Sequence, residues 1–179
     1  MNKKLSSVVT LVTTQVAPSA LESGTWVVGL ADIEAHTGKL TSKVFSSEIP
    51  RSSKFLFSAG DILFGKLRPE LQKCVVAPHH GVCSTDIIVM RPNCLDDTWY
   101  VSLMLRSDII TNQIKRRLVG ASLPRVRPSD LLACEIPWPD SATRALNGTR
   151  AQTISEIREA IRDMSATLAV IESRLQSPQ

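Results

Sequence analysis

The stretch SAGDILFGKLRPELQK, residues 58–73, decides the fold of this chain. Its centre, residues 61–64, is a short β-prone run with a glycine at each end, which is typical of a strand. Two cations, Lys66 and Arg68, follow the run at once. The stretch therefore predicts a strand that ends directly in basic side chains.

Runs of the same kind lie on both sides of this stretch. Residues 26–30, 72–77, 86–90 and 134–136 are each short, mostly apolar and bounded by turn residues. Their apolar residues are continuous rather than alternating, which favours strands buried within a compact curved sheet.

A helical region follows these strands. Residues 97–118 keep roughly helical spacing of apolar side chains, and Ser107 is a good N-cap at which a second helical segment begins. Gly120 is the predicted C-terminal stop. Residues 123–128, LPRVRP, are predicted to be extended because proline is excluded from helix interiors.

The last 30 residues have a different character. Residues 1–140 hold all but one of the ten prolines and all but one of the eight glycines, whereas residues 149–177 hold neither. This region predicts one helix with a heptad seam, whose members follow at intervals of three and four: Ile154, Ile157, Ile161, Met164, Leu168, Ile171 and Leu175. A helix with one narrow apolar stripe is unstable alone in water, so it packs either on its own domain or, as the strict period favours, in a coiled coil.

The charge permits a polyanionic partner. The formal net charge is +4 and the pI is about 9.0. The basic residues are clustered, in residues 51–73 and again in residues 115–127, and such clusters are the electrostatic footprint of nucleic-acid binding. Aromatic residues make up only 4%, which argues against stacking on single-stranded nucleic acid.

Cysteine usage indicates a reducing compartment. The four cysteines lack the C-x-x-C spacing of zinc or redox sites, so we interpret them as reduced side chains in a cytoplasmic protein without a metal site. The N-terminal residues 1–20 resemble a signal peptide only in outline, and an amphipathic first strand or helix is the better interpretation. No apolar run approaches the roughly 20 residues that span a bilayer.

Motifs for catalysis are missing from the sequence. It contains no Gly-rich phosphate loop, no G-x-S-x-G, no methyltransferase N/D-P-P-Y/F motif and no nuclease P-D…(D/E)-x-K arrangement. The chain is therefore predicted not to be an enzyme and to bind no cofactor of its own.

Five blocks, in order, carry a resemblance to a known family. They are GLADIEAHTG (residues 29–38), GDILFGKLRP (60–69), GVCSTDIIVMRP (81–92), GASLPRV (120–126) and IPWP (136–139). Together with the long heptad helix, they resemble a target recognition domain of Type I restriction–modification specificity subunits. The resemblance covers roughly residues 25–175.

The resemblance implies a mixed α/β fold (α+β), with a strongly bent sheet in residues 1–145 and a coiled-coil helix in residues 146–179. It implies sequence-specific binding of double-stranded DNA in a system of DNA methylation, restriction and phage defence. An N6-adenine methyltransferase subunit and a nuclease–translocase subunit would be the partners, and these would bind S-adenosylmethionine, ATP and magnesium. The chain departs from the family's pattern in two places. After IPWP it continues with DSATR (residues 140–144), and its helix is short for a spacer helix.

DNA binding by such a module needs cations on phosphates and polar side chains on base edges. The candidate DNA-contacting residues are Arg51, Lys54, Lys66, Arg68, Lys73, His79, His80, Lys115, Arg116, Arg117, Arg125 and Arg127. Among them, residues 79–80 and 112–116, with 46–53, are the candidates for reading bases. Each cation has an alternative interpretation as a solvated surface charge, and Lys66 and Arg68 as framework residues.

The single recognition unit leads to a hypothesis on assembly. Full specificity subunits carry two units whose helices pair antiparallel, so the seam of this chain is predicted to pair with a second copy or with another recognition unit. A homodimer would read two identical half-sites. Two alternatives stay open: a stand-alone DNA-binding decoy or regulator, and an interaction protein whose helix is its functional part.

Overall fold

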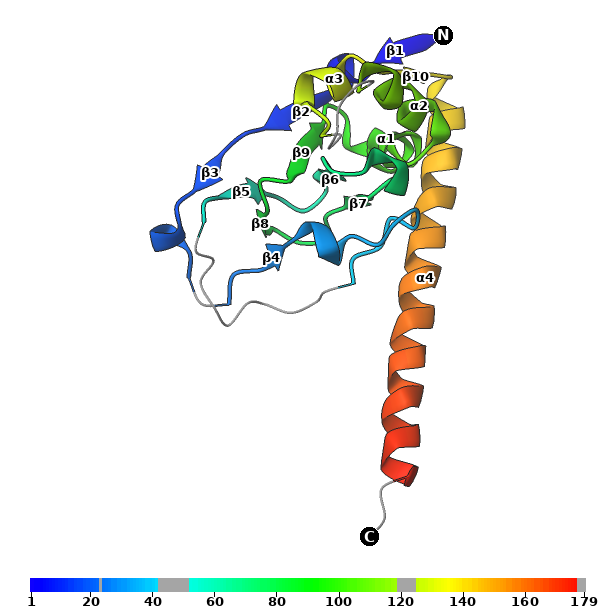
Figure 1. The fold of residues 1–179 in the computed structure, drawn as a ribbon. Helices are drawn as coiled ribbons and strands as arrows, with labels where there is room; N and C mark the ends of the chain where they lie inside the picture. Colours follow the sequence, from blue (N-terminus) through cyan, green and yellow to red (C-terminus); the bar gives the residue numbers. More distant parts are fainter. Residues whose placement is uncertain (23, 42–51, 119–124, 177–179) are drawn as a thin grey trace.

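The computed structural model describes residues 1–22, 24–41, 52–118 and 125–176, with side chains described up to residue 172. A head of short strands and helices precedes one long helix, α4 (Ser141–Gln176), which runs alongside the head and continues beyond it (Figure 1). The two chain ends lie at opposite ends of the molecule. The predicted fold class, a mixed α/β head followed by a long C-terminal helix, is confirmed.

A four-stranded antiparallel sheet forms the centre of the head. Its order is β2 (Val9–Val12), β9 (Ile87–Pro92), β6 (Ile62–Gly65) and β7 (Cys74–Val76). Along β6, Ile62 and Phe64 contact one hydrophobic core, and Leu63 between them contacts a second core on the other face. The continuous apolar run of this strand is therefore buried on both sides, as the sequence predicted.

A second four-stranded sheet lies against the first. Its order is β3 (Gln15–Val16), β5 (Lys54–Phe57), β8 (Gly81–Cys83) and β4 (Val27–Val28), with only the β4–β8 pair parallel. The chain passes directly from β2 into β3 and from β8 into β9, so the two sheets bend around the second core. This arrangement corresponds to the bent sheet that the family resemblance implied.

Three helices cover the first core on the far side of the central sheet. They are α1 (Thr98–Leu105), α2 (Asp108–Arg117) and α3 (Pro128–Leu132), and the break at Ser107 lies where the sequence predicted it. Helix α3 was not predicted, because residues 123–128 were interpreted as extended. Pro128 is tolerated there as the first helical residue, where its fixed φ suits the helix and its missing N–H would have no partner.

Short elements complete the head. Strand β1 (Asn2–Lys4) pairs antiparallel with β10 (Glu135–Pro137), which brings the N-terminus close to the start of α4. Five 3-10 turns connect the strands and helices: η1 (Leu5–Ser7), η2 (Pro18–Ala20), η3 (Leu30–Asp32), η4 (Pro69–Leu71) and η5 (Leu95–Asp97). The N-terminal residues thus form strands, one of the two structures expected for them, and bury Leu5 and Val9 in the core.

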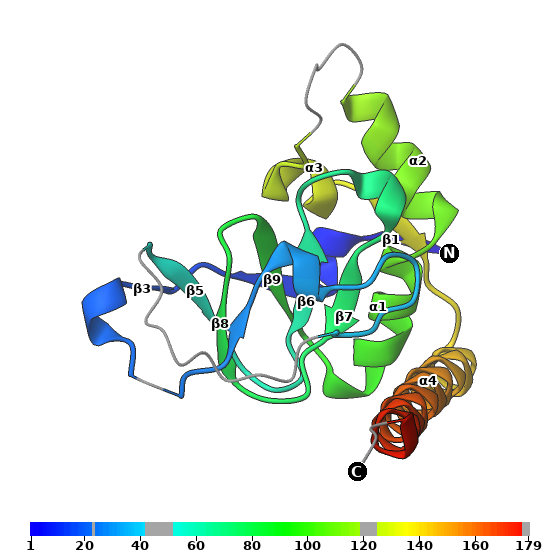
Figure 2. The ribbon, with the colours of Figure 1, turned by 60° about the horizontal axis from the view of Figure 1, so that its bottom comes forward.

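Helix α4 begins at Ser141, earlier than residues 146 and 149, at which the predicted coiled-coil segment and the glycine-free stretch begin. The Asp140 carboxylate accepts a hydrogen bond of 2.9 Å from the Thr143 amide, which caps the first turn. Gly148 lies inside the helix and faces α1, where a Cβ would lie 3.4 Å from the backbone nitrogen of Tyr100, at ordinary van der Waals distance. Viewed nearly along its axis, α4 stands beside the head next to α1 (Figure 2). No helix among the described residues is both long enough and apolar enough to cross a membrane.

Candidate nucleic-acid interface

Three chain segments meet directly after β6 and bring cations together. The Lys66 amide donates to the Asp86 carbonyl oxygen at 2.8 Å, and the Val126 amide donates to the Lys66 carbonyl oxygen at 2.8 Å. Leu67 and Arg125 form an antiparallel bridge. We term Lys66, Arg68, Asp86 and Arg125 the cation junction. The structure thus joins two basic blocks that lie almost 60 residues apart in the sequence.

Asp86 lies between two of these cations. Its carboxylate forms an ion pair with Arg125, with an Nη2–Oδ1 distance of 2.5 Å, and the arginine side chain is 55% exposed. Lys66 donates its Nζ proton to the Thr85 carbonyl oxygen and lies 5.4 Å from the centre of the Phe55 ring. Partial burial, with the nearby positive charge of Arg125, lowers the pKa of Lys66. An exposed ion pair such as Arg125–Asp86 is worth only about 0–1 kcal/mol, so a phosphate can compete for Arg125.

Arg68 and Lys115 share a second acid. Arg68 has a left-handed backbone with φ of 53°, and its Nε lies 3.1 Å from Glu70 Oε1. Slight burial raises the pKa of Glu70. Hydrogen bonds from the Glu70 amide and from Arg68 lower this pKa, as do the charges of Arg68 and Lys115, and the net shift is downward. Arg68, from the family-like block, and Lys115, from the end of α2, therefore act on the same surface.

Lys54 extends this basic surface along β5. Its Nζ donates to Ser52 Oγ at 2.6 Å, and its charge, like that of Lys66, acts on Cys83. Burial nevertheless raises the pKa of the Cys83 thiol to about 12, so it stays protonated. Cys74, Cys83 and Cys134 are buried, and all four cysteines are free thiols.

Two further candidate cations, like Lys66, donate to backbone carbonyl oxygens of the head. Lys73 donates its Nζ proton to the Leu30 carbonyl oxygen at 2.8 Å. Arg117 donates to the carbonyl oxygens of Gln113 at 3.0 Å and Ala133 at 3.3 Å, and so ties α2 to α3. These contacts give both side chains a structural role, which stands beside the predicted role in DNA binding.

The remaining candidates are spread over the head. Arg116 and Arg127 are exposed near the ends of α2 and α3, and Asn112 is exposed on α2. The last residue of β7, Val76, pairs with Ile62 at the beginning of β6. His79 and His80 follow β7 and are exposed, so they lie at the opposite end of the sheet from Lys66. Arg51, and residues 46–50 among the candidates for base reading, lie outside the described residues.

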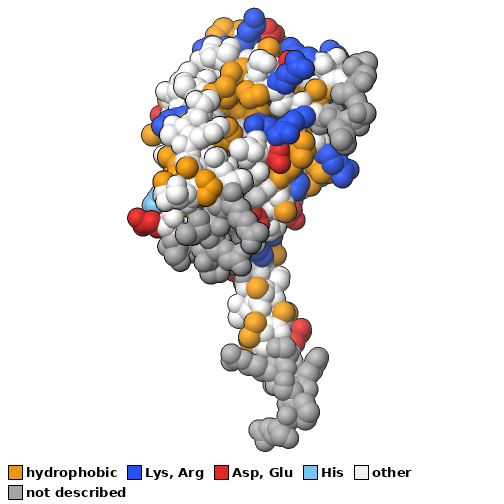
Figure 3. Space-filling model, turned by 60° about the vertical axis from the view of Figure 1, so that its left-hand side comes forward, with side chains coloured by type: hydrophobic (Ala, Val, Ile, Leu, Met, Phe, Trp, Pro, Cys, Tyr) orange, Lys and Arg blue, Asp and Glu red, His pale blue; other side chains and the backbone are white. Residues whose placement is uncertain are grey.

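The surface of the molecule shows where cations gather on one face of the head. On the face shown in Figure 3, Lys and Arg side chains gather on the upper part of the head, interspersed with exposed apolar side chains and with fewer acidic ones. Among the charged side chains on this face cations predominate, which is what a phosphate-binding surface requires.

The apolar seam of α4 is not covered by the head. Ile154, Ile157, Ile161, Met164, Leu168 and Ile171 are between 49% and 72% exposed. The face of α4 that contacts the head is a different one and carries Gly148, Ala151 and Ser155. At about 100° per residue the two faces are separated by about 130° around the helix axis. The side chain of Leu175 lies outside the described ones.

Some structural side chains were missed by the sequence interpretation. Asp61 is almost fully buried and binds Arg91 with both carboxylate oxygens, at 2.8 and 2.9 Å. Asp97 binds Arg144 at the start of α4 at 2.7 Å. An aspartate next to an apolar strand or helix was the only available signal, and it does not identify its partner.

Part of the chain is similar in sequence to a known protein. No family model matches the chain. Over 108 residues, 60% of this chain and 24% of the relative, it is 28% identical to the Type I restriction enzyme EcoDI specificity subunit of Escherichia coli. The chain therefore spans about a quarter of the length of this curated relative.

Solved structures match nearly the whole chain. An HsdS subunit from Thermoanaerobacter tengcongensis has a TM-score of 0.69 at 23% identity, over 98% of this chain and 47% of that one. A Type I restriction–modification S subunit from M. genitalium has a TM-score of 0.64 at 12% identity, over 98% and 44%. A structure of Type I restriction–modification complex assembly has a TM-score of 0.71 at 24% identity, over 98% and 48%.

These findings agree with the prediction that the chain is not itself an enzyme, because the named relatives are specificity subunits. The recognition made from the sequence is thereby confirmed: the chain is similar in sequence to a Type I restriction–modification specificity subunit and has the fold of about half of such a subunit.

Proposed function

We propose that this chain recognises double-stranded DNA by sequence, as a specificity component of a Type I restriction–modification system. In this proposal residues 1–145 form the DNA-reading domain and residues 146–179 the pairing helix. The observation that carries it is the cation junction, in which Lys66 and Arg68 of one segment come together with Arg125 of another, in a specificity-subunit fold.

The junction is suited to phosphate binding. Its arginines are exposed and are paired only with exposed acids, so exchange of a carboxylate for a phosphate costs little. Backbone hydrogen bonds fix the three segments, so the cations have a defined spacing. Fixed cations on phosphates give affinity and register, whereas the base choice comes from other side chains.

The seam of α4 is the proposed site of pairing with a second recognition unit. Six half-exposed apolar side chains in heptad spacing match what a coiled coil buries. The solved relatives are about twice as long as this chain, which favours a helix from a second unit as the occupant. A second copy of this chain is the simplest such unit and would make a two-fold dimer.

The catalytic partners follow from the relatives. A specificity component directs other subunits, so we propose an N6-adenine methyltransferase subunit and a nuclease–translocase subunit as partners. S-adenosylmethionine, ATP and magnesium would be bound there. Action on chromosomal DNA and the four free cysteines favour a cytoplasmic location.

Salt dependence of binding to duplex DNA tests this proposal. We expect the affinity to fall steeply as salt rises, because released counterions drive phosphate binding. In the Arg68→Ala/Arg125→Ala double variant, the slope of log affinity against log salt should decrease by about two, one for each lost contact. Arg150→Ala, which removes an exposed arginine of α4, is the matched control and should leave the slope unchanged. A chain that self-associates but has no affinity for duplex DNA would contradict the proposal and favour the interaction-protein alternative.

A further inference from the structure

Helix α4 is attached to the head at two places, and the first is its base. Arg144 forms a 2.7 Å ion pair with Asp97, donates to the Pro139 carbonyl oxygen at 2.7 Å and lies 4.4 Å from the centre of a Trp138 ring. Gly148, in the same part of the helix, packs against Trp99 and Tyr100 of α1. The base of α4 is therefore fixed in position.

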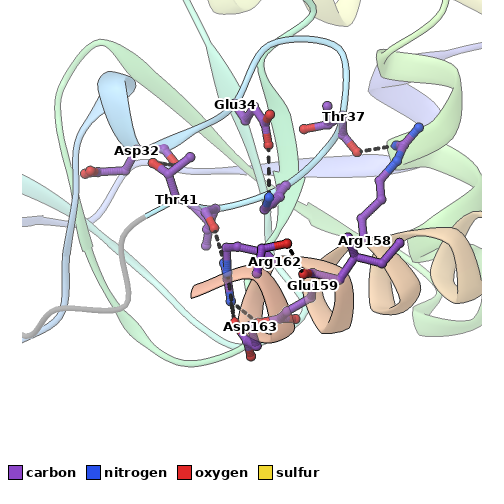
Figure 4. A network of polar contacts seen from close by, with 12 residues as sticks. Asp32, Glu34, Thr37, Thr41, Arg158, Glu159, Arg162 and Asp163 are labelled. Atoms are coloured by element: carbon purple, nitrogen blue, oxygen red, sulfur yellow. Dashed lines mark hydrogen bonds and ion pairs between the residues drawn. The ribbon is translucent and has the colours of Figure 1, made fainter. Parts of the chain in front are cut away.

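The second attachment lies further along the helix and uses two arginines. Arg158 Nη1 donates to the Thr37 carbonyl oxygen at 2.8 Å, and Arg162 Nη1 donates to the Leu40 carbonyl oxygen at 2.8 Å. Both acceptors belong to the loop of residues 34–41, which reaches from the head to the helix (Figure 4). Glu159 and Asp163 form ion pairs with Arg162 from within the helix and so orient its guanidinium group.

The loop that supplies these carbonyl groups is itself well anchored. The Glu34 amide donates to the Lys39 carbonyl oxygen at 2.9 Å, and the His36 amide donates to the Leu71 carbonyl oxygen at 2.9 Å. Gly38, with φ of +72°, leaves room for Arg106, whose Nη1 would clash with a Cβ there. Arg106 is in turn hydrogen-bonded to Ser102 Oγ at 2.9 Å. The loop is thus a rigid part of the head.

Between the two attachments the helix is not packed continuously on the head. A cavity of about 620 Å³ lies there, lined among others by Leu40, Val75, Trp99, Ser155 and Glu156. Close packing over this part of α4 therefore contributes little to its direction. The contacts of Arg158 and Arg162 are left to hold the helix against tilting.

We infer that Arg158 and Arg162, with the loop of residues 34–41, form a brace that fixes the direction of α4 relative to the DNA-reading head. This inference rests on the proposed function in one respect: through the paired helices, the brace sets the length of DNA between two half-sites. In this inference the two arginines are positioning residues, since they act through the direction of the helix.

Helix geometry gives the size of the effect. Arg144 and Arg162 are 18 residues apart, so the two attachments are separated by about 27 Å along the axis. From Arg144 to the end of α4 at Gln176 the helix is about 48 Å long, so a 10° tilt about its base displaces the tip by about 8 Å. That displacement corresponds to roughly two base pairs of duplex, at about 3.4 Å each.

A distance measurement tests the brace without reference to DNA. Spin labels at Ser19→Cys on the head and Glu172→Cys on the helix, in a Cys94→Ser background, report the direction of α4 by electron–electron resonance. We expect one narrow distance distribution, and for Arg158→Ala/Arg162→Ala a distribution broadened or shifted by several ångströms, of the order of the about 8 Å above. Arg150→Ala, outside the brace, is the control. The same narrow distribution in all three proteins overturns the inference.

A second measurement separates the brace from the proposed function. Wild type and the double variant are each used to select from a pool of duplexes of random sequence. We expect the same half-sites for both proteins, one constant gap for wild type and a spread of gaps for the variant. An equally constant gap in the variant overturns the link to spacing. Enrichment of no sequence by wild type contradicts the proposed function instead, and the spin-label distances still decide on the brace.

Discussion

Isoleucine side chains are buried in the head but exposed in the distal half of α4. In the head, Ile110 and Ile136 are fully buried in a core assembled from sheet and helices. In the helix, Ile157 and Ile161 are more than half exposed, although their spacing is just as regular. The head therefore buries its apolar residues within one chain, whereas the seam of the helix is left exposed, as the proposed pairing with another helix requires.

The charged residues show the reverse relation. The arginines of α4 that face the head, Arg144, Arg158 and Arg162, donate to carboxylate or carbonyl oxygens of the head. The arginines of the cation junction, Arg68 and Arg125, are exposed and held only by exposed acids. This contrast supports the proposal that the exposed cations of the head bind a polyanion and that the exposed seam of α4 pairs with another helix.

The largest expected effect is on folding of the head. Ile136→Ala removes atoms from a closed core and should lower its free energy of unfolding by about 2–5 kcal/mol, because a cavity remains. Ile161→Ala, the same change in the seam, should change the unfolding of the monomer by less than about 0.5 kcal/mol. Urea denaturation of both variants measures the difference. Equal losses would contradict the assignment of the two regions.

The next largest effect is on self-association. Ile157→Asp places a charge in the seam and should weaken pairing at least tenfold, about 1.4 kcal/mol, because the charge would be buried without a partner. Ala166→Asp adds the same charge on the opposite side of α4 and serves as the control. Sedimentation equilibrium measures both. A wild-type chain that is monomeric at tens of micromolar would exclude pairing with its own copy.

A smaller effect is expected at the cation junction. Asp86→Asn removes the acid that pairs with Arg125, so the affinity for duplex DNA should rise by up to about tenfold at low salt, by the Coulomb energy of one nearby charge in water. The increase should shrink at high salt because exposed charges are screened. Fluorescence anisotropy at two salt concentrations measures it. An affinity that falls would indicate that the pair maintains the fold and does not contact phosphate.

The smallest effect concerns the start of α4. Hydrogen bonds from Thr143 lower the pKa of the Asp140 carboxyl below its usual 3.8, so folding favours the ionised form. Its stabilising effect is therefore complete above about pH 4 and is lost as the pH falls through the lowered value. Asp140→Asn should be slightly less stable than wild type at neutral pH, and the difference should be smaller at pH 2.5. Thermal unfolding at the two pH values compares them.

Local patterns predicted much of the fold. The strand of residues 61–64 and the helix break at Ser107 depend on neighbouring residues, and both were found. The start of α4 was predicted too late, because the helix was inferred from the stretch without glycine or proline, which begins only after Gly148.

The candidate site was predicted less completely, because the partners of charged residues are distant in the sequence. Lys73 and Arg117 were indistinguishable from Arg125 in the sequence, yet their acceptors are backbone carbonyl oxygens, in the first case 43 residues away. In the sequence, the brace arginines of α4 stand outside the heptad seam and nothing near them indicates an acceptor. Their acceptors, at Thr37 and Leu40, lie more than 120 residues earlier.

The most direct test is selection from duplex DNA of random sequence by the purified chain, followed by sequencing of the bound fraction. If the head reads bases and the helix joins two heads, the bound duplexes will contain two copies of one short sequence, inverted and separated by a constant gap. Bound duplexes that share no sequence and are retained equally at low and high salt would contradict the proposal that the head reads bases and the helix joins two heads.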